Sequence, residues 1–164
     1  MLGDSLLVAP VFTQDGTVSY YLPKGKWTHL LTHAVVAGGQ WLEEQYDFMS
    51  LPLYVKENTL LPIGVNQERP DYCYTDDLEI HVFELQDKAE CKIYGLDGTE
   101  KLAIEGIRED NQFTFKFKGE AKNLKIILRN MSLIKNLAGG ENISKKDEMI
   151  IKINQELENI TFNI

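Results

Sequence analysis

Alternation of apolar and polar residues is clearest in the second half of the chain. It runs through residues 78–83 (LEIHVF), 113–118 (FTFKFK) and 124–128 (LKIIL). Successive side chains of an extended chain point to opposite faces, so a period of two predicts half-buried β-strands. Asp97-Gly98 suits a tight turn, because glycine tolerates positive φ. Further strands are predicted on both sides of this turn and in the C-terminal tail: 91–94, 102–104, 148–153 and 159–164.

The first half shows shorter apolar runs separated by glycine and proline. Two of the predicted strands lie within 49–63 and carry Pro52 and Pro62. Proline lacks the amide donor of a strand ladder, so it favours an edge or a bulge. The other strands are predicted at 5–12, 17–22, 26–32 and as two pieces of 34–42 on either side of Gly38-Gly39. No segment has helical period, and we expect an all-β chain of two small antiparallel β-sandwich domains in tandem.

A polar, turn-rich stretch separates the two sets of strands. Residues 64–77 (GVNQERPDYCYTDD) contain few aliphatic side chains. Domain boundaries usually fall in such exposed segments. We therefore predict domains at 1–66 and 67–164.

Composition indicates a packed globular protein. The 164 residues are 43% hydrophobic, and 17 basic against 25 acidic residues give a net charge of −8. This charge repels phosphate backbones and anionic lipids, so we expect neither nucleic acid nor a membrane as partner. The N-terminus lacks the basic region of a signal peptide, which predicts a cytoplasmic location. Cys73 and Cys91 are expected to be buried free thiols, with one bridge between them as the alternative.

The histidines do not form a metal site in this interpretation. His29 and His33 are four residues apart, which on a strand separates them by roughly 13 Å, too far to share one ion. His81 stands alone in an alternating strand. We expect no metal and no cofactor.

Two pairs of adjacent acids, Glu43-Glu44 and Asp76-Asp77, are candidates for the two carboxylates that glycoside hydrolysis needs. Neighbours on an extended chain point to opposite faces, so neither pair converges on a substrate, and both are expected to be solvated turn acids. Nucleophile elbows, phosphate loops and dinucleotide fingerprints are missing from the sequence. We therefore predict no catalytic residue.

Several aromatic residues could form a platform that stacks on sugars, although packing in a core or an interface is the favoured interpretation. These residues are Tyr20, Tyr21, Trp27, Trp41, Tyr72 and Tyr74.

Six segments resemble the C-terminal region of glycoside hydrolase family 31, and the bacterial α-xylosidases in particular. They are 1–12 (MLGDSLLVAPVF), 20–32 (YYLPKGKWTHLLT), 38–41 (GGQW), 50–64 (SLPLYVKENTLLPIG), 69–72 (RPDY) and 81–87 (HVFELQD). The resemblance covers nearly the whole chain and is strongest over 1–87. It implies the proximal and distal β-domains that follow the catalytic barrel.

In that family two barrel aspartates perform retaining hydrolysis, and no residue here matches their motifs. The 164 residues are also too few for a complete barrel, which takes roughly 200 to 250. Asp4 is expected to have a structural role at a turn or strand end. The resemblance implies support of a catalytic barrel, an uncovered apolar face near Leu6, Val8 and Tyr54, and contacts between copies of the chain. The alternatives are a carbohydrate-binding module and an independent enzyme with other chemistry.

Overall fold

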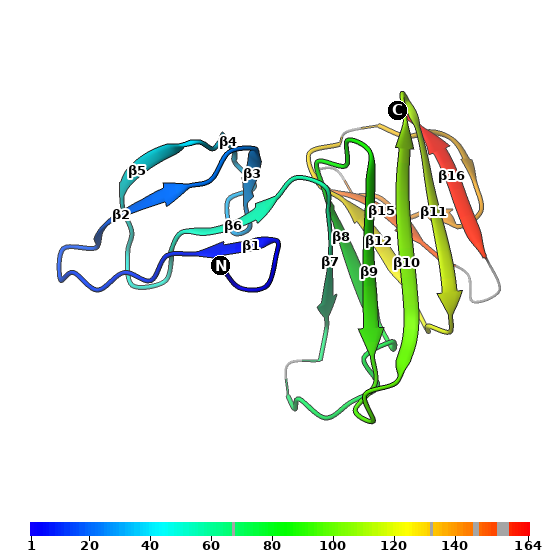
Figure 1. Cartoon of the computed structure of the whole chain (residues 1–164). Helices are drawn as coiled ribbons and strands as arrows, with labels where there is room; N and C mark the ends of the chain where they lie inside the picture. Colours follow the sequence, from blue (N-terminus) through cyan, green and yellow to red (C-terminus); the bar gives the residue numbers. More distant parts are fainter. Residues whose placement is uncertain (67, 132, 146–147, 154–157) are drawn as a thin grey trace. The chain divides into compact units, whose positions relative to one another are not determined.

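The computed structural model divides the chain into two compact units, Met1–Glu57 and Asn58–Ile164 (Figure 1). It describes residues 1–66, 68–131, 133–145, 148–153 and 158–164. These residues form strands, turns and loops and no helix, which confirms the all-β prediction. No helix of the described part could therefore cross a membrane.

The first unit is a small sandwich of two sheets. A four-stranded sheet has the order β1-β6-β3-β4, and β2 pairs with β5 in a separate ribbon, all antiparallel. The core draws on both sheets through Leu7, Leu22, Trp27 and Tyr54. The strands are β1 (Leu6–Val8), β2 (Thr17–Leu22), β3 (Lys26–His29), β4 (Val35–Ala37), β5 (Gln40–Gln45) and β6 (Leu53–Lys56).

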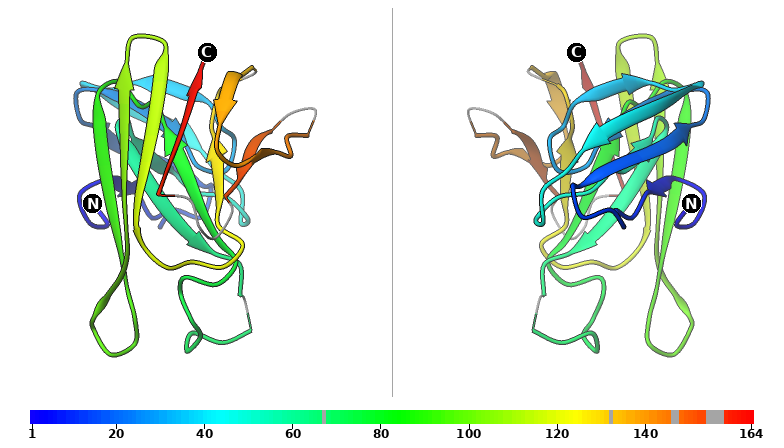
Figure 2. Two further views of the ribbon diagram at one scale, coloured as in Figure 1. Left: turned by 90° about the vertical axis from the view of Figure 1, so that its right-hand side faces the viewer. Right: turned by 90° about the vertical axis from the view of Figure 1, so that its left-hand side faces the viewer.

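The second unit is a larger sandwich of two five-stranded sheets. Their orders are β13-β16-β11-β10-β9 and β14-β15-β12-β8-β7. Figure 2 shows these strands from two further sides. The strands are β7 (Thr59–Gly64), β8 (Leu78–Phe83), β9 (Lys88–Tyr94), β10 (Glu100–Glu109), β11 (Gln112–Gly119), β12 (Lys125–Leu128), β13 (Lys135–Ala138), β14 (Glu141–Asn142), β15 (Met149–Lys152) and β16 (Asn159–Asn163).

The predicted alternation builds the core of this second unit. Ile80 of β8 and Phe113 and Phe115 of β11 are fully buried, so the apolar faces of the two sheets meet. The ring of Phe113 stacks on that of Phe162 from β16 at 5.2 Å. However, β8 is not half-buried as expected, because His81 and Phe83 on its other face are also buried.

Strand β7 lies inside the second unit, whereas the expected boundary at 66/67 would leave it in the first. All six residues of β7 pair with β8, so the polar stretch 64–77 is a loop that joins two paired strands. Pro62 lies on β7, which is an edge strand as its missing donor requires. Pro52 instead precedes β6, and β6 lies inside its sheet, so the edge prediction was wrong there.

One pairing departs from the antiparallel expectation. Strands β8 and β12 run parallel, with Ile80 opposite Ile126. Parallel neighbours need a long crossover, and β9 to β11 provide it by forming the other sheet. The short strands β13 and β14 were not predicted, because Lys135–Ala138 and Glu141–Asn142 lack a clear alternation.

Candidate functional site

The first unit exposes three large apolar side chains on two loops. Phe12 is 91% exposed on the loop between β1 and β2, and Phe48 and Met49 are 104% and 87% exposed on the loop between β5 and β6. A hollow of about 920 Å³ is lined by residues of both loops, including Tyr46 and Phe48. We call Phe12, Phe48, Met49 and this hollow the loop surface. Large exposed apolar groups on adjoining loops are typical of a contact surface.

The two loops are joined by hydrogen bonds. The Tyr46 amide donates to the Gly16 carbonyl at 3.0 Å, and the Gln45 Nε2 donates to the Asp15 carbonyl at 2.7 Å. A Cβ on Gly16 would lie 2.1 Å from the Tyr46 carbonyl oxygen, and the φ of Gly16 is +78°. Only glycine therefore allows this close approach of the two backbones.

Each loop also carries its own aspartate cap. Asp15 Oδ1 accepts from the Thr17 amide at 3.1 Å, and Asp47 Oδ1 accepts from the Met49 amide at 3.0 Å. The Ser50 hydroxyl adds a bond to Asp47, and these donors hold the pKa of the Asp47 carboxyl below its ordinary value. The exposed apolar side chains are thus presented on ordered turns.

A network of tyrosines and one carboxylate holds Tyr46, which lines the hollow of the loop surface. Glu44 Oε2 accepts hydrogen bonds from the Tyr20 hydroxyl and, at 2.8 Å, from the Tyr46 hydroxyl. The hydroxyls of Tyr20 and Tyr54 lie 3.2 Å apart. Burial and then the bond to Glu44 raise the pKa of Tyr20 and Tyr46, so both stay protonated donors.

His29 completes this network from β3. Its Nδ1 accepts from the amides of Leu31 and Thr32 at 3.2 and 3.3 Å, so the proton of the neutral ring is on Nε2. Nε2 lies 3.3 Å from the Tyr46 hydroxyl, and burial lowers the pKa of His29. This neutral histidine holds a turn and a tyrosine in place.

Several predictions for the first unit need correction. Glu43 and Glu44 both lie on strand β5, so neither is a turn acid as expected. Glu44 is half-buried, whereas Glu43 on the opposite face is exposed and accepts a bond from Ser19. Tyr54 is 2% exposed and belongs to the core, so it cannot contribute to an uncovered apolar face. Leu6 and Val8 are half-buried, because their strand pairs with β6.

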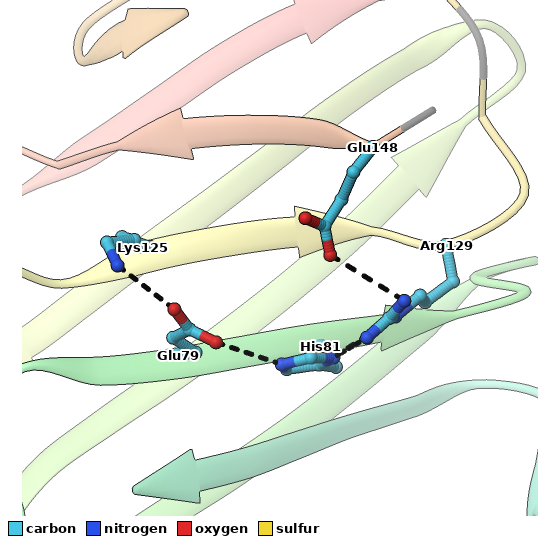
Figure 3. Close-up of polar contacts among 5 residues, drawn as sticks. All are labelled: Glu79, His81, Lys125, Arg129 and Glu148. Carbon is cyan, nitrogen blue, oxygen red and sulfur yellow. Dashed lines mark hydrogen bonds and ion pairs between the residues drawn. The ribbon is translucent and has the colours of Figure 1, made fainter. Parts of the chain in front are cut away.

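A second polar cluster lies on β8, β12 and the ends of their neighbours (Figure 3). His81 is 5% exposed, and its Nδ1 accepts from Arg129 Nε at 3.1 Å and Nη2 at 2.7 Å. His81 Nε2 lies 3.5 Å from Glu79 Oε2, and Lys125 Nζ lies 3.0 Å from Glu79 Oε1. Arg129 Nη1 is also 3.7 Å from Glu148 Oε1.

The charges in this cluster alternate in sign. Burial and then Arg129 lower the pKa of His81, so the ring is neutral. Burial alone would raise the pKa of Glu79, but the hydrogen bond from Lys125 and the nearby His81 ring outweigh it and hold the pKa below its ordinary value. The cluster therefore links β8, β12 and the residue before β15 through ion pairs.

The remaining candidates are dispersed. Asp77 accepts from Asn123 Nδ2 at 2.9 Å in an exposed turn, and Asp4 lies exposed in the turn before β1. Cys73 and Cys91 are both free, but Cys73 is exposed, so the expectation of two buried thiols was wrong for it. Burial raises the pKa of Cys91 to about 12.

The aromatic residues weighed as a sugar-stacking platform are divided between a core, the surface of the first unit and the second unit. Trp27 is buried and its Nε1 donates to the Pro23 carbonyl at 2.8 Å, and Tyr20 is buried too. Tyr21 and Trp41 form an exposed pair across β2 and β5 at 5.8 Å. Tyr72 and Tyr74 lie together elsewhere, in the second unit.

The prediction that His29 and His33 lie far apart on one strand was wrong, because β3 ends at His29 and the His33 amide donates to the His29 carbonyl at 2.8 Å across a turn. The two ring nitrogens of His29 instead face the Leu31 and Thr32 amides and the Tyr46 hydroxyl. Within the described ranges, no three histidine, cysteine or acidic side chains are grouped closely enough to hold a metal ion. The sequence did not indicate Phe12, Phe48 or Met49 as functional. The available signal was a strongly apolar pair, Phe48-Met49, in the polar segment 43–50.

Comparison with known proteins identifies the class of this two-unit chain. The family model described as glycosyl hydrolase family 31 C-terminal domain matches residues 1–61. A dextranase of that family from Flavobacterium johnsoniae has the same fold over 100% of this chain and 26% of its own, with a TM-score of 0.80 at 16% identity. The α-xylosidase from Xanthomonas citri gives 0.68 at 19% identity, over 98% of this chain and 19% of its own.

The second unit matches a more specific family model than the first. Residues 73–164 match the model described as alpha-xylosidase YicI, C-terminal domain, and the chain therefore belongs to the C-terminal domains of family 31 α-xylosidase-type enzymes. The alpha-xylosidase XylQ of Lactiplantibacillus pentosus is 30% identical over 136 residues. An alpha-xylosidase of Emericella nidulans is 33% identical over 111 residues. These matches cover 81% and 62% of this chain but only 16% and 14% of the two relatives.

Proposed function

We propose that this chain is the C-terminal, non-catalytic part of a retaining α-glycosidase that acts on α-linked xylosides or glucosides, and that its first unit supports the catalytic barrel. Two relatives are named alpha-xylosidase and a third, from Bacillus thermoamyloliquefaciens, is named alpha-glucosidase 2. The chain spans about a sixth of the length of its alpha-xylosidase relatives. The non-catalytic role is supported by the match of residues 1–61 and 73–164 to C-terminal domain models of family 31.

The observation that carries the docking proposal is the loop surface. Phe12, Phe48 and Met49 are almost fully exposed on turns that hydrogen bonds hold in place. Burial of one such side chain contributes about 1.5 to 3 kcal/mol, and ordered turns lose little entropy on binding. This burial would stabilise the complex between a catalytic barrel and the loop surface. The contact would also restrain the substrate loops of the barrel.

Reconstitution from two polypeptides tests the proposal. The catalytic barrel of the enzyme that carries this chain would be produced separately and mixed with it. We expect binding, a higher thermal midpoint of the barrel and a gain in hydrolysis of a chromogenic α-xyloside or α-glucoside. Phe48→Ser should weaken the binding about tenfold or more, because it removes roughly 1.5 to 3 kcal/mol of apolar burial. Val35→Ser, which changes a 48% exposed residue on β4, is the matched control and should bind normally.

Three results would overturn the proposal. Hydrolysis of either glycoside by the purified chain alone would show that it is catalytic. Absence of binding between the chain and the barrel would remove the supporting role. Equal binding by Phe48→Ser and the unchanged chain would exclude the loop surface as the contact.

A further inference from the structure

The second unit has a groove lined by residues of the loop before β8 and of the β9–β10 turn. Figure 1 shows this turn and this loop at the same end of the unit. Its volume is about 540 Å³, within the range usual for small-molecule sites. One wall comes from residues 69–75 and the other from Tyr94 to Asp97 with Lys101.

Three tyrosines line the groove. The rings of Tyr72 and Tyr74 meet edge to face, with centroids 4.9 Å apart and planes at 89°. The Tyr74 hydroxyl donates to the Pro70 carbonyl at 2.8 Å, which fixes this pair to its own loop. Tyr94 stands on the opposite wall and is 49% exposed, beside Leu96 at 67%. Rings fixed in this way offer apolar area to a ligand at little cost in entropy.

Two glycines make room for these side chains. A Cβ on Gly64 would lie 1.8 Å from the Tyr72 hydroxyl oxygen, so this position on β7 admits only glycine while Tyr72 keeps its place. A Cβ on Gly95 would lie 2.6 Å from Lys101 Cε and 2.8 Å from Asp97 Oδ1. Gly64 thus leaves the space that the Tyr72 hydroxyl occupies, and Gly95 leaves space beside the side chains of Lys101 and Asp97.

The rim carries paired charges of opposite sign. Lys101 Nζ lies 3.0 Å from Asp97 Oδ2, and Arg69 Nε lies 4.0 Å from Asp71 Oδ1. Bonds from the Thr99 hydroxyl and amide, and then from Lys101, lower the pKa of Asp97 to about 2. Asp97 is therefore an ionised acceptor at any ordinary pH. Because each charge is balanced by its partner, the rim favours neither an anionic nor a cationic ligand.

We propose that this groove binds one neutral pyranose unit of an oligosaccharide. A sugar ring has an apolar C–H face that packs on tyrosine and an edge of hydroxyls that act as both donors and acceptors. The groove matches this with Tyr72, Tyr74 and Tyr94 for the face, and with Asp97, Lys101 and Arg69 for the hydroxyls. All residues that line the groove belong to the second unit, so its ligand binding can be tested without a barrel.

Titration of the whole chain with maltotriose, followed by amide NMR, tests this proposal. We expect saturable shifts with a Kd on the order of 1 mM, in which the amides of Gly64, Tyr94 and Gly95 move together. Tyr94→Ala should weaken binding about tenfold, because it removes the more exposed aromatic wall. Tyr21→Ala is the matched control, since Tyr21 is a 44% exposed tyrosine of the first unit. It should leave the Kd unchanged.

The variant remains interpretable because Tyr94 is half exposed, and an unchanged amide spectrum away from the groove would show that Tyr94→Ala is folded. Three results would overturn the proposal: no saturable shift, an unchanged Kd in folded Tyr94→Ala, or a loss of binding in Tyr21→Ala. The last would assign the sugar to the exposed Tyr21 and Trp41 pair instead.

Discussion

At the scale of single residues, Glu43 and Glu44 show how much one position along a strand decides. Both belong to β5, and their side chains point to opposite faces. Glu43 accepts a bond from the exposed Ser19 hydroxyl at 3.0 Å, whereas Glu44 accepts from Tyr20 and Tyr46 next to the core. The two glutamates therefore contribute differently to the stability of the first unit.

We expect Glu44→Ala to lower the free energy of unfolding by about 2 to 3 kcal/mol, because it leaves partly buried tyrosine hydroxyls without their charged acceptor. Glu43→Ala, the control, should cost less than about 0.5 kcal/mol. Urea unfolding followed by tryptophan fluorescence measures both, since Trp27 and Trp41, the two tryptophans of the chain, lie in the first unit. Equal losses for the two variants would contradict the assigned network.

The opposite orientation of these two acids was predictable from the sequence, because it follows from the geometry of any strand. The partners of Glu44 were not. Tyr20 is 24 residues away from Glu44, and only the pairing of β2 with β5 brings the two together. His29, which bonds to the other partner Tyr46, lies on a strand of the other sheet.

At the scale of elements, the cluster of His81, Arg129, Glu79, Lys125 and Glu148 joins β8 and β12 with the start of β15. Its hydrogen bonds require a neutral His81, because Nδ1 accepts from Arg129. Protonation there would lose these bonds and place two cations side by side. The pKa of His81 is accordingly lower than its ordinary 6.5.

This predicts a loss of stability in mild acid. As pH falls through 6.5, the unfolded chain binds the proton while folded His81 does not, so the free energy of unfolding falls toward the folded pKa. The slope is at most about 1.4 kcal/mol per pH unit for one proton. Above about pH 7.5 the effect vanishes. Urea unfolding at pH 7.5, 6.5 and 5.5, followed by circular dichroism, measures this slope.

His81→Gln keeps an acceptor for Arg129 but does not titrate, so its slope between pH 6.5 and 5.5 should be smaller. It should not reach zero, because the pKa of His29 is also lowered by burial and acts with the same sign. Glu79, whose pKa is lowered, loses its contribution only at more acidic pH, below its ordinary 4.5. Identical slopes for the variant and the unchanged chain would show that His81 does not titrate as argued.

At the scale of the whole molecule, the chain has two cores and an apolar loop surface that its own residues leave exposed. If the loop surface binds a catalytic barrel, it should bind another apolar surface when the barrel is missing. In a solution of the purified chain, a second copy of the chain can provide this surface. The net charge of −8 on each copy opposes association, but salt at about 0.15 M screens charges beyond about 8 Å.

We therefore expect concentration-dependent self-association of the purified chain in sedimentation velocity at about 0.15 M salt. Phe12→Ser should shift the distribution toward monomer, because it removes one 91% exposed aromatic from the contact. Val35→Ser on β4 should not. A strict monomer at all concentrations would count against the loop surface as a contact surface.

The sequence by itself determined the all-β class, most of the strands and the family resemblance. Periods of two and turn residues act over a few neighbours, so Phe113 and Phe115 indicate their buried face without any knowledge of distant partners. The resemblance of segments 1–12 and 69–72 to family 31 is likewise carried by contiguous residues.

Only the tertiary structure decided which strands pair, where the units divide and which side chains are uncovered. Strand β7 joins the second unit because β8 accepts it as an edge, and β12 reaches β8 in parallel through a crossover of three strands. Exposure of Phe48 and burial of Tyr54 depend on contacts between segments far apart in the chain. Such contacts are set by the packing of whole sheets, and no local pattern encodes them.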